Sequence, residues 1–500
     1  MAFFEFNIAM SGLFAAQRGL QVTSNNISNA NTEGYSRQKL SQQASTPITG
    51  LSVGMTGTGV TTTGINRVRD AFIDSKLWTQ NARLGEYNIK VTQNSIVEVA
   101  FGEPSDSGFT KVFNNMFSAM SSLSNNPSSK DAKVVLKEEM TSFTKYFNNI
   151  AGTLEKQQKD LNFELKGLVT EINTLATQIQ NLNKQIFEAE IYGSEASSFR
   201  DERDKCIDRL SEIIDTEVKE EEYEINGNTV NKFSVKIAGQ TLVDHLNANT
   251  LNTEVRAQKM NANDVDGLYD VVWSNGTKFD MADVNMSGEL KGVIDMRDGA
   301  GAKAENTYNG IPYYIERLNT YVRQFAKTMN ELYSEKENPK KYALFTYTMG
   351  ETASEPISAA ELDYDQLTAA NFSISKEIND APYDMRTLYD KSNPSDSSFM
   401  LNLVAQKNNK DMFNEGDPKD YMVAIFSELG INAKEAEMYQ NTQVALTNNL
   451  KNQRLSVSQV DITEEFTYLI QYQQAYQAAA KVMNTMDGIY ETTLFKLGNF

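Results

Sequence analysis

Residues 154–186 read LEKQQKDLNFELKGLVTEINTLATQIQNLNKQI, and their apolar positions repeat with an alternating spacing of four and three. This spacing is typical of a long helix whose apolar seam packs in a coiled coil or a helical bundle. At ~1.5 Å per residue such a helix would be about 50 Å long. We expect a bundle within one chain in preference to a zipper between chains. The seam residues are Leu154, Leu161, Leu165, Leu168, Ile172, Leu175, Ile179, Leu182 and Ile186.

The composition around this helix is poor in catalytic side chains. The chain has 500 residues, with a single cysteine, Cys206, and a single histidine, His245. These counts exclude a disulfide framework within the chain, multi-cysteine metal clusters and zinc sites that need two histidines. They also argue against most acid–base catalysis near neutral pH. Carboxylate-pair chemistry is the enzyme class that the composition leaves open.

Two glycine-containing segments invite ligand-binding interpretations that fail on spacing. Gly54, Gly57 and Gly59 would need a further glycine at position 62, which is Thr62, to make a dinucleotide fingerprint. A calcium loop with Gly267 at its sixth position would end at Trp273, where a glutamate is required. We therefore expect no cofactor, no metal site and no catalytic residue.

The charge is acidic and unevenly distributed. Lys and Arg number 47 against 66 Asp and Glu, a formal charge of −19, which argues against nucleic-acid binding. Residues 200–300 hold 21 acidic and 12 basic side chains, whereas residues 1–60 hold two acidic and three basic ones. This distribution suggests ends that pack against other chains and a middle that faces solvent.

Neither a membrane span nor a standard leader is predicted. No window of about 18 apolar residues occurs, so we expect no membrane insertion. The first ten residues lack a positive leader and carry Glu5 within an apolar run, which makes a poor secretory signal. If the protein leaves the cell, we expect it to do so without a cleaved signal peptide.

Both ends of the chain have the pattern of amphipathic helices. The first is predicted to run to about residue 30, where an asparagine-rich segment, 25–35, should stop it. The last begins after Asp461, a capping residue with Glu464 in capping-box position. Because such helices gain most of their stability from packing, we expect each end to pack on the other and to offer any remaining apolar face to neighbouring copies.

The segments between the two ends differ in the spacing of their apolar residues. Glycines between residues 50 and 64 indicate an irregular, flexible segment. Residues 217–243 are predicted to form a β-hairpin around Asn226-Gly227, and residues 268–273 a further strand. A helix is predicted at 311–332, residues 340–400 look irregular or weakly β, and helical patterns resume near Phe399.

These segments predict a mainly α fold with inserted β-rich domains. We expect an elongated, multi-domain chain with a terminal α-helical coiled coil and a long helical bundle. Residues 1–65 with 455–500 form the predicted terminal core, and 66–215 with 291–339 and 400–454 the bundle. Residues 216–290 form the predicted β-rich outer domain, and 340–399 a second small outer domain or an irregular insertion.

Motifs at both ends resemble those of a known family. The amino-terminal motif comprises Ser11-Gly12-Leu13, Gln17, Leu20, Asn26-Ile27-Ser28-Asn29-Ala30-Asn31-Thr32 and Gly34-Tyr35. The carboxyl-terminal motif comprises Glu464-Glu465-Phe466 and Leu469-Ile470-Gln471-Tyr472-Gln473-Gln474-Ala475-Tyr476. Both resemble the motifs of bacterial flagellar axial proteins, the rod, hook and hook-associated proteins. Gly34-Tyr35-Ser36-Arg37-Gln38 and Phe199-Arg-Asp-Glu-Arg-Asp204 are similar to the hook-associated protein 1 family in particular.

This resemblance implies a structural subunit, not an enzyme, at the junction of hook and filament, and hence a part in motility. It implies secretion through the flagellar type III export channel without a cleaved signal peptide, to an extracellular place in the bacterial flagellum. The implied partners are further copies in a ring, hook protein, hook-associated protein 3, and an export chaperone at the carboxyl-terminal helix. The terminal helices would line the inner tube and the middle domains would face outward. The predicted assembly interface consists of Leu13, Leu20, Asn26, Ile27, Asn29, Asn31, Thr32, Gly34, Tyr35, Phe466, Leu469, Ile470, Tyr476, Ala480, Met483, Tyr490 and Leu494.

Two alternatives remain at this point. The chain could be another axial protein, such as hook protein or a distal rod subunit. The chain could also be a secreted, carboxylate-dependent glycan hydrolase, although no specific pair of carboxylates stands out among the 66 acidic residues.

Overall fold

The structure, a computed structural model, describes residues 2–50, 54–102, 108–192, 196–225, 228–280, 286–334, 343–348, 362–389, 392–393 and 395–493. The chain divides into two units. The terminal unit comprises Met1–Arg83, Glu171–Thr250 and Gln443–Phe500, and the inner unit comprises Leu84–Thr170 and Leu251–Thr442. The finer four-part division expected from the sequence stays a prediction.

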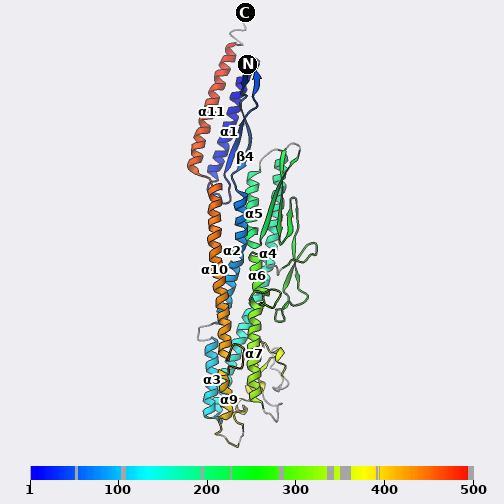
Figure 1. Ribbon diagram of the computed structural model, residues 1–500, viewed down its shortest axis with the longest axis vertical. Coiled ribbons are helices and arrows are strands. Elements are labelled where there is room, and N and C mark those ends of the chain that lie inside the picture. Colours follow the sequence, from blue (N-terminus) through cyan, green and yellow to red (C-terminus); the bar gives the residue numbers. More distant parts are fainter. Residues whose placement is uncertain are drawn as a thin grey trace. The chain divides into compact units, whose positions relative to one another are not determined.

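The terminal unit is built on its two end helices. Helix α1 (Ala2–Ser28) lies antiparallel to α11 (Ile462–Glu491), and Figure 1 shows them side by side, blue and red. The Phe6 ring meets the Tyr490 ring edge-on at 6.4 Å, and Gly19 lies against the ring of Tyr472. As predicted, α1 ends close to residue 30, at Ser28 within the asparagine-rich segment, and Asp461 caps α11 by accepting from the backbone N–H groups of Thr463 and Glu464.

Residues 38–44, 48–50, 54–56 and 60–67 form strands, which corrects the prediction of an irregular, flexible segment. Strand β1 (Gln38–Ala44) pairs antiparallel with β4 (Val60–Arg67), and the short β2 (Ile48–Gly50) pairs with β3 (Gly54–Thr56). The sequence hides these strands because polar residues and glycines replace the usual apolar alternation. The β1–β4 ribbon packs on α1, and tertiary contact therefore decides its conformation.

A second part of the terminal unit joins a helix to a four-stranded sheet. Helix α5 (Ser197–Ile213) is followed by β5 (Thr216–Ile225), β6 (Asn228–Ile237), β7 (Gln240–Asp244) and β8 (Asn247–Ala248), in spatial order β5-β6-β7-β8. The predicted hairpin is the β5–β6 pair, whereas Asn226-Gly227 lies outside the described residues. Its second arm is shorter than predicted, since Ala238 and Gly239 turn at positive φ into β7.

The inner unit closes around an aromatic core. Its helices include α3 (Phe109–Asn125), α6 (Glu289–Asp298), α7 (Ile311–Tyr333), α8 (Lys376–Asp380) and α9 (Ser398–Ala405). The short turns η1 (Tyr364–Gln366), η2 (Pro382–Asp384) and η3 (Gln406–Asn408) lie among them. Two small sheets pair β9 (Leu251–Val255) with β10 (Tyr269–Trp273) and β11 (Phe345–Tyr347) with β12 (Phe372–Ile374). The helix predicted at 311–332 and the strand predicted at 268–273 are confirmed as α7 and β10.

Three long helices contribute residues to both units. They are α2 (Ala71–Phe101), α4 (Lys130–Ile191) and α10 (Pro418–Ser458). Of the nine seam residues on α4, Leu182 is half-buried and the other eight are buried, at most 8% exposed. The seam is therefore covered within a single chain.

Candidate assembly surfaces

The terminal helix pair leaves much of its apolar surface uncovered. Glu465 is the one buried residue that α11 contributes among those described. From the predicted interface, Leu13, Leu20, Ile27, Leu469, Ala480, Met483 and Tyr490 are half-buried between the helices and their neighbours, whereas Phe466, Ile470 and Tyr476 are exposed. Leu494 lies outside the described residues. The large apolar side chains exposed on the pair are Phe14, Ile462, Phe466, Ile470, Tyr476, Val482 and Ile489.

Asn26 fastens the end of α1 to the start of β1. Its side chain is 1% exposed, and its Oδ1 accepts from the Tyr35 hydroxyl at 2.8 Å and from the backbone N–H of Gln38 at 3.0 Å. Its Nδ2 donates to the Gln38 carbonyl at 2.8 Å. Burial, with Asp201 and Glu465 nearby, raises the pKa of Tyr35 well above its ordinary value. Asn26 and Tyr35 therefore fix the chain reversal inside one subunit.

The loop that follows α1 is held by short polar contacts and a glycine. Asn29 Nδ2 donates to the Asn25 carbonyl at 3.0 Å, and Thr32 Oγ1 donates to Asn29 Oδ1 at 3.2 Å. Gly34 has φ of +78°, and a Cβ there would collide with the side chain of Lys205 on α5. This backbone conformation favours glycine. Asn31, Thr32 and Gly34 remain exposed, so this loop offers surface to a neighbour.

Arg37 bridges the break between α10 and α11. Its backbone N–H donates to the Ser458 carbonyl, the end of α10, at 2.9 Å. Its Nε donates to buried Glu465 at 2.8 Å and its Nη1 to exposed Glu464 at 3.0 Å, both in the first turn of α11. The bond from Arg37 also holds the pKa of Glu464 below its usual range. One arginine thus ties the amino-terminal segment to both carboxyl-terminal helices.

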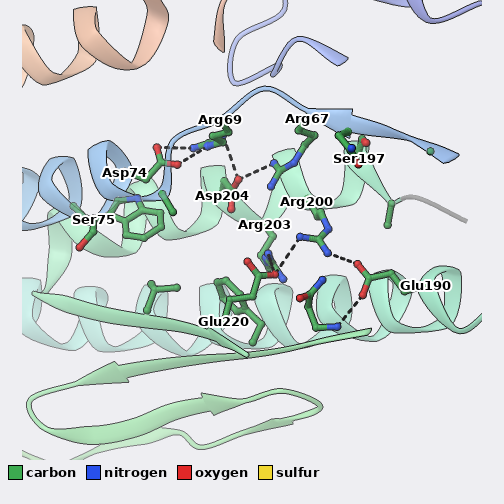
Figure 2. A pocket seen from close by; sticks show the side chains of 18 of the residues that line it. Arg67, Arg69, Asp74, Ser75, Glu190, Ser197, Arg200, Arg203, Asp204 and Glu220 are labelled. Carbon is green, nitrogen blue, oxygen red and sulfur yellow. Dashed lines mark hydrogen bonds and ion pairs between the residues drawn. The ribbon is translucent and has the colours of Figure 1, made fainter. Parts of the chain in front are cut away.

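A cluster of ion pairs joins β4, the start of α2 and α5. Figure 2 shows Arg69 between Asp74 and Asp204, which it contacts at 2.7 and 3.2 Å. Arg67 Nη1 contacts both Asp201 and Asp204 at 2.8 Å. Burial alone would raise the pKa of Asp204, but the nearby Arg69, Arg67 and Arg203 outweigh it and lower that pKa.

Asp208 extends this cluster to α10. It accepts from the Trp78 indole N–H at 2.7 Å and pairs with Arg454. Burial raises the pKa of Asp208, although Arg454 opposes the shift. The cluster therefore consists of carboxylates held by arginines, which is the geometry of a structural joint and not of a free carboxylate pair.

The sequence singled out none of these ionic residues as a site. The run Phe199–Asp204 was noted only because it is similar to a segment of the hook-associated protein 1 family. One usable signal was present: Asp201, Asp204 and Asp208 follow spacings of three and four and share one face of a helix. Their partners lie over 100 residues away in the sequence, so no local pattern predicts them.

The remaining chemical candidates are His245 and Cys206. His245 follows β7 directly, with φ of +53°, and its ring packs edge-on against Phe187 at 5.1 Å. Cys206 is half-buried, and its thiol lies 3.5 Å from Gln178 Oε1. Across the described ranges, no three Asp, Glu, His or Cys side chains gather as a metal site would require. No described helix has the length and apolar content needed to cross a membrane.

Comparison with protein families gives three matches along the chain. Residues 6–35 match the family "Flagella basal body rod protein", and residues 451–494 match "Flagellar basal body rod FlgEFG protein C-terminal". Residues 95–336 match "Flagellar hook-associated protein FlgK helical domain". The two rod-protein matches cover most of α1 with its loop, and the end of α10 with all of α11.

Individual relatives match from end to end. The chain is 29% identical to flagellar hook-associated protein 1 of Bacillus subtilis, over 99% of this chain and 98% of that protein. It is 24% identical to flagellar hook-associated protein 1 of Escherichia coli, over 98% of both. The flagellar hook junction protein FlgK from Burkholderia pseudomallei has a similar fold, with a TM-score of 0.60 and 13% identity, over 77% of this chain and all of that one. The chain is therefore similar over its whole length to flagellar hook-associated protein 1, a structural protein of the bacterial flagellum.

Proposed function

We propose that this protein is the structural subunit that joins the flagellar hook to the filament, and that it assembles through its terminal helices. The observation that carries the proposal is the α1–α11 pair, whose exposed apolar side chains are not covered by any described residue of the chain. Similarity over the whole chain to flagellar hook-associated protein 1 supports the junction role.

The exposed side chains on α11 fall on both sides of its contact with α1. Phe466 and Ile470 are one helical turn apart and are 51% and 52% exposed. Val482 and Ile489, seven residues apart, are 45% and 49% exposed on the opposite flank. An exposed apolar surface of this extent marks a contact site for other proteins. A helix flanked by neighbours on both sides is the arrangement that a closed ring of subunits requires.

The proposed partners follow the position of this surface. Copies of the same chain would cover the flanks of α11 within a ring, with hook protein on one side of the ring and hook-associated protein 3 on the other. We propose export through the type III channel without a cleaved signal peptide, and an export chaperone that covers α11 beforehand. The acidic segments 216–290 and 340–399 would then face outward.

Deletion of residues 461–500 tests the role of the terminal pair. We expect cells that carry the deletion to make hooks without attached filaments, as seen by electron microscopy. Full-length filaments on such hooks would contradict the proposal. Immunolabelling at the hook–filament boundary, as opposed to the length of the hook or the rod, separates this function from that of another axial protein.

A surface substitution separates assembly from folding. Phe466→Gln with Ile470→Gln should leave the helical content of the purified chain unchanged and should reduce filament attachment. The matched control is Gln471→Ala, an exposed position on the same helix. Equal loss of filaments in the control, or none in the double variant, would contradict an interface at these residues.

A further inference from the structure

A cavity of about 790 Å³ lies within the terminal unit beside the ionic joint. It is lined by β4, the start of α2, the first turns of α5, the end of α4 and the strands β5 and β6. Figure 2 shows Arg67, Arg200 and Arg203 on its wall together with Glu190 and Glu220.

Arg203 is buried with part of its hydrogen-bonding capacity unused. The residue is 2% exposed, and its guanidinium lies 3.5 Å from the centre of the Phe233 ring. Nη1 donates to Asn183 at 3.2 Å and Nη2 to Glu220 at 3.3 Å, but the buried Nε has no partner among the described residues. An unpaired buried donor of a charged group is costly. A ligand oxygen in the cavity would remove that cost.

Acidic partners near Arg203 are shared. Glu220 Oε1 accepts from Arg203 and also from Arg200 at 3.1 Å, so one carboxylate serves two arginines. Arg200 contacts Glu190 as well, and Glu190 also accepts from the backbone N–H of Asn231. Burial lowers the pKa of Arg203 despite Asp204 and Glu220 nearby. The cavity lining holds four arginines and four acidic residues, so a ligand would satisfy the unused Nε donor of Arg203 and not an excess of positive charge.

The amino end of helix α5 also lies at this wall of the cavity and contributes partial positive charge. The helix starts at Ser197, and its capping position, Ala196, has no side chain that could accept from the first-turn N–H groups. Both residues line the cavity. Among the described residues no side chain caps this 17-residue helix, whose amino end carries partial positive charge and suits a negatively charged group.

We propose that this cavity binds a carboxylate group, held by Arg200 and Arg203 near the amino end of α5. A carboxylate fits better than a phosphate because Glu190, Glu220 and Asp204 already line the wall and would repel a second negative charge. A guanidinium can serve two carboxylates, as Arg67 does with Asp201 and Asp204 in the same unit. The carboxylate could be a free acid or an Asp or Glu side chain of a neighbouring copy, since the chain carries 66 acidic residues.

Binding is tested on the purified full-length chain, independently of any assembly. The probe is a capped Gly-Glu-Gly peptide, and its control is capped Gly-Gln-Gly, which differs only in the charged group. Calorimetric titration at low salt should show saturable binding of the first and none of the second. Arg200→Gln should weaken binding at least ten-fold, whereas Arg209→Gln, on the same helix but away from this cavity, should not.

A second variant keeps the test decisive if Arg200→Gln disturbs the fold. Glu220→Gln removes the carboxylate that both arginines share, so binding of the Glu peptide should become several-fold tighter. A damaged fold would not produce tighter binding. Absence of saturable binding, equal binding of both peptides, or tighter binding of inorganic phosphate than of the Glu peptide would overturn the proposal.

Competition distinguishes the two sources of the carboxylate. If a neighbouring copy supplies it, the Glu peptide should slow the self-association of the full chain, measured by light scattering, and Glu220→Gln should accelerate it. If a free acid is the ligand, the peptide binds and self-association is unchanged. Failure of the filament experiments above with intact peptide binding would refute the assembly role and leave this site standing.

Discussion

The inner unit and the terminal helix pair differ in how far they bury their large apolar side chains. In the inner unit, Phe109, Phe143, Phe147 and Phe325 are all fully buried and their rings meet one another at 5.2–6.4 Å. On α11, the large apolar side chains Phe466 and Ile470 are more than half exposed. The inner unit therefore completes its core within one chain, whereas the terminal pair stays incomplete until other chains cover it.

Removal of one ring from the inner core should have the largest effect. Phe143 contacts the rings of Phe109, Phe113, Phe147, Phe325, Phe345 and Phe372. Phe143→Ala should lower the free energy of unfolding by about 3–5 kcal/mol, because it leaves a cavity where the surrounding rings cannot collapse. Urea denaturation of the purified chain measures the change.

The control lies on the same helix. Phe163 on α4 is 78% exposed, and Phe163→Ala should change the free energy of unfolding by no more than about 0.5 kcal/mol. Equal losses in the two variants would show that burial in the inner unit does not set its stability.

Alkaline pH should destabilise the inner unit through its buried tyrosines. Burial and Glu428 raise the pKa of Tyr313 from 10.0 to about 12, and burial raises that of Tyr421 to about 12 and that of fully buried Tyr321 well above 10.0. The folded chain therefore binds more protons than the unfolded chain between pH 10 and 12. Stability is intact below pH 10 and falls as the pH rises through this window.

Urea denaturation at several pH values, followed by circular dichroism, measures this decline. Tyr421→Phe removes one of the ionising groups and should make the decline shallower. A free energy of unfolding that stays constant from pH 9.5 to pH 12 would contradict the prediction.

The terminal pair can be perturbed at the one place where its helices touch most closely. A Cβ on Gly19 would lie 2.5 Å from Tyr472 Cδ1, so Gly19→Ala must push α11 away from α1. We expect a cost of about 1–3 kcal/mol, as for overpacked contacts. Faster hydrogen exchange in both helices measures the separation.

Gly12 is the matched position, seven residues earlier on α1, where a Cβ would meet nothing within 4 Å. Gly12→Ala should stabilise the helix by up to about 1 kcal/mol, because alanine is the better helix former. If both substitutions act in the same direction, the close contact at Gly19 does not hold the pair together.

Sequence reasoning succeeded where neighbours along the chain determine structure. The seven-residue spacing from Leu154 predicted the long helix, Asp461 predicted the start of α11, and the apolar face from Ile315 to Met329 predicted α7. It failed where contacts between residues far apart in the sequence determine structure. Strands β1 and β4 pack on α1, and Arg67, Arg69 and Arg454 pair with carboxylates of α5 that lie more than 100 residues away in the sequence. Local periodicity carries no information about such pairs.

The smallest change in the stability of the isolated chain is expected from a substitution on the exposed face of α11. Phe466→Ala makes the same chemical change as Phe143→Ala, yet the free energy of unfolding should change by at most about 0.5 kcal/mol, because the Phe466 ring is 51% exposed. In cells, the same substitution should reduce filament attachment, since neighbouring subunits would cover that ring. A loss of about 2 kcal/mol or more in the isolated chain would mean that the terminal pair has a closed core of its own, and its exposed rings would then no longer point to missing neighbours.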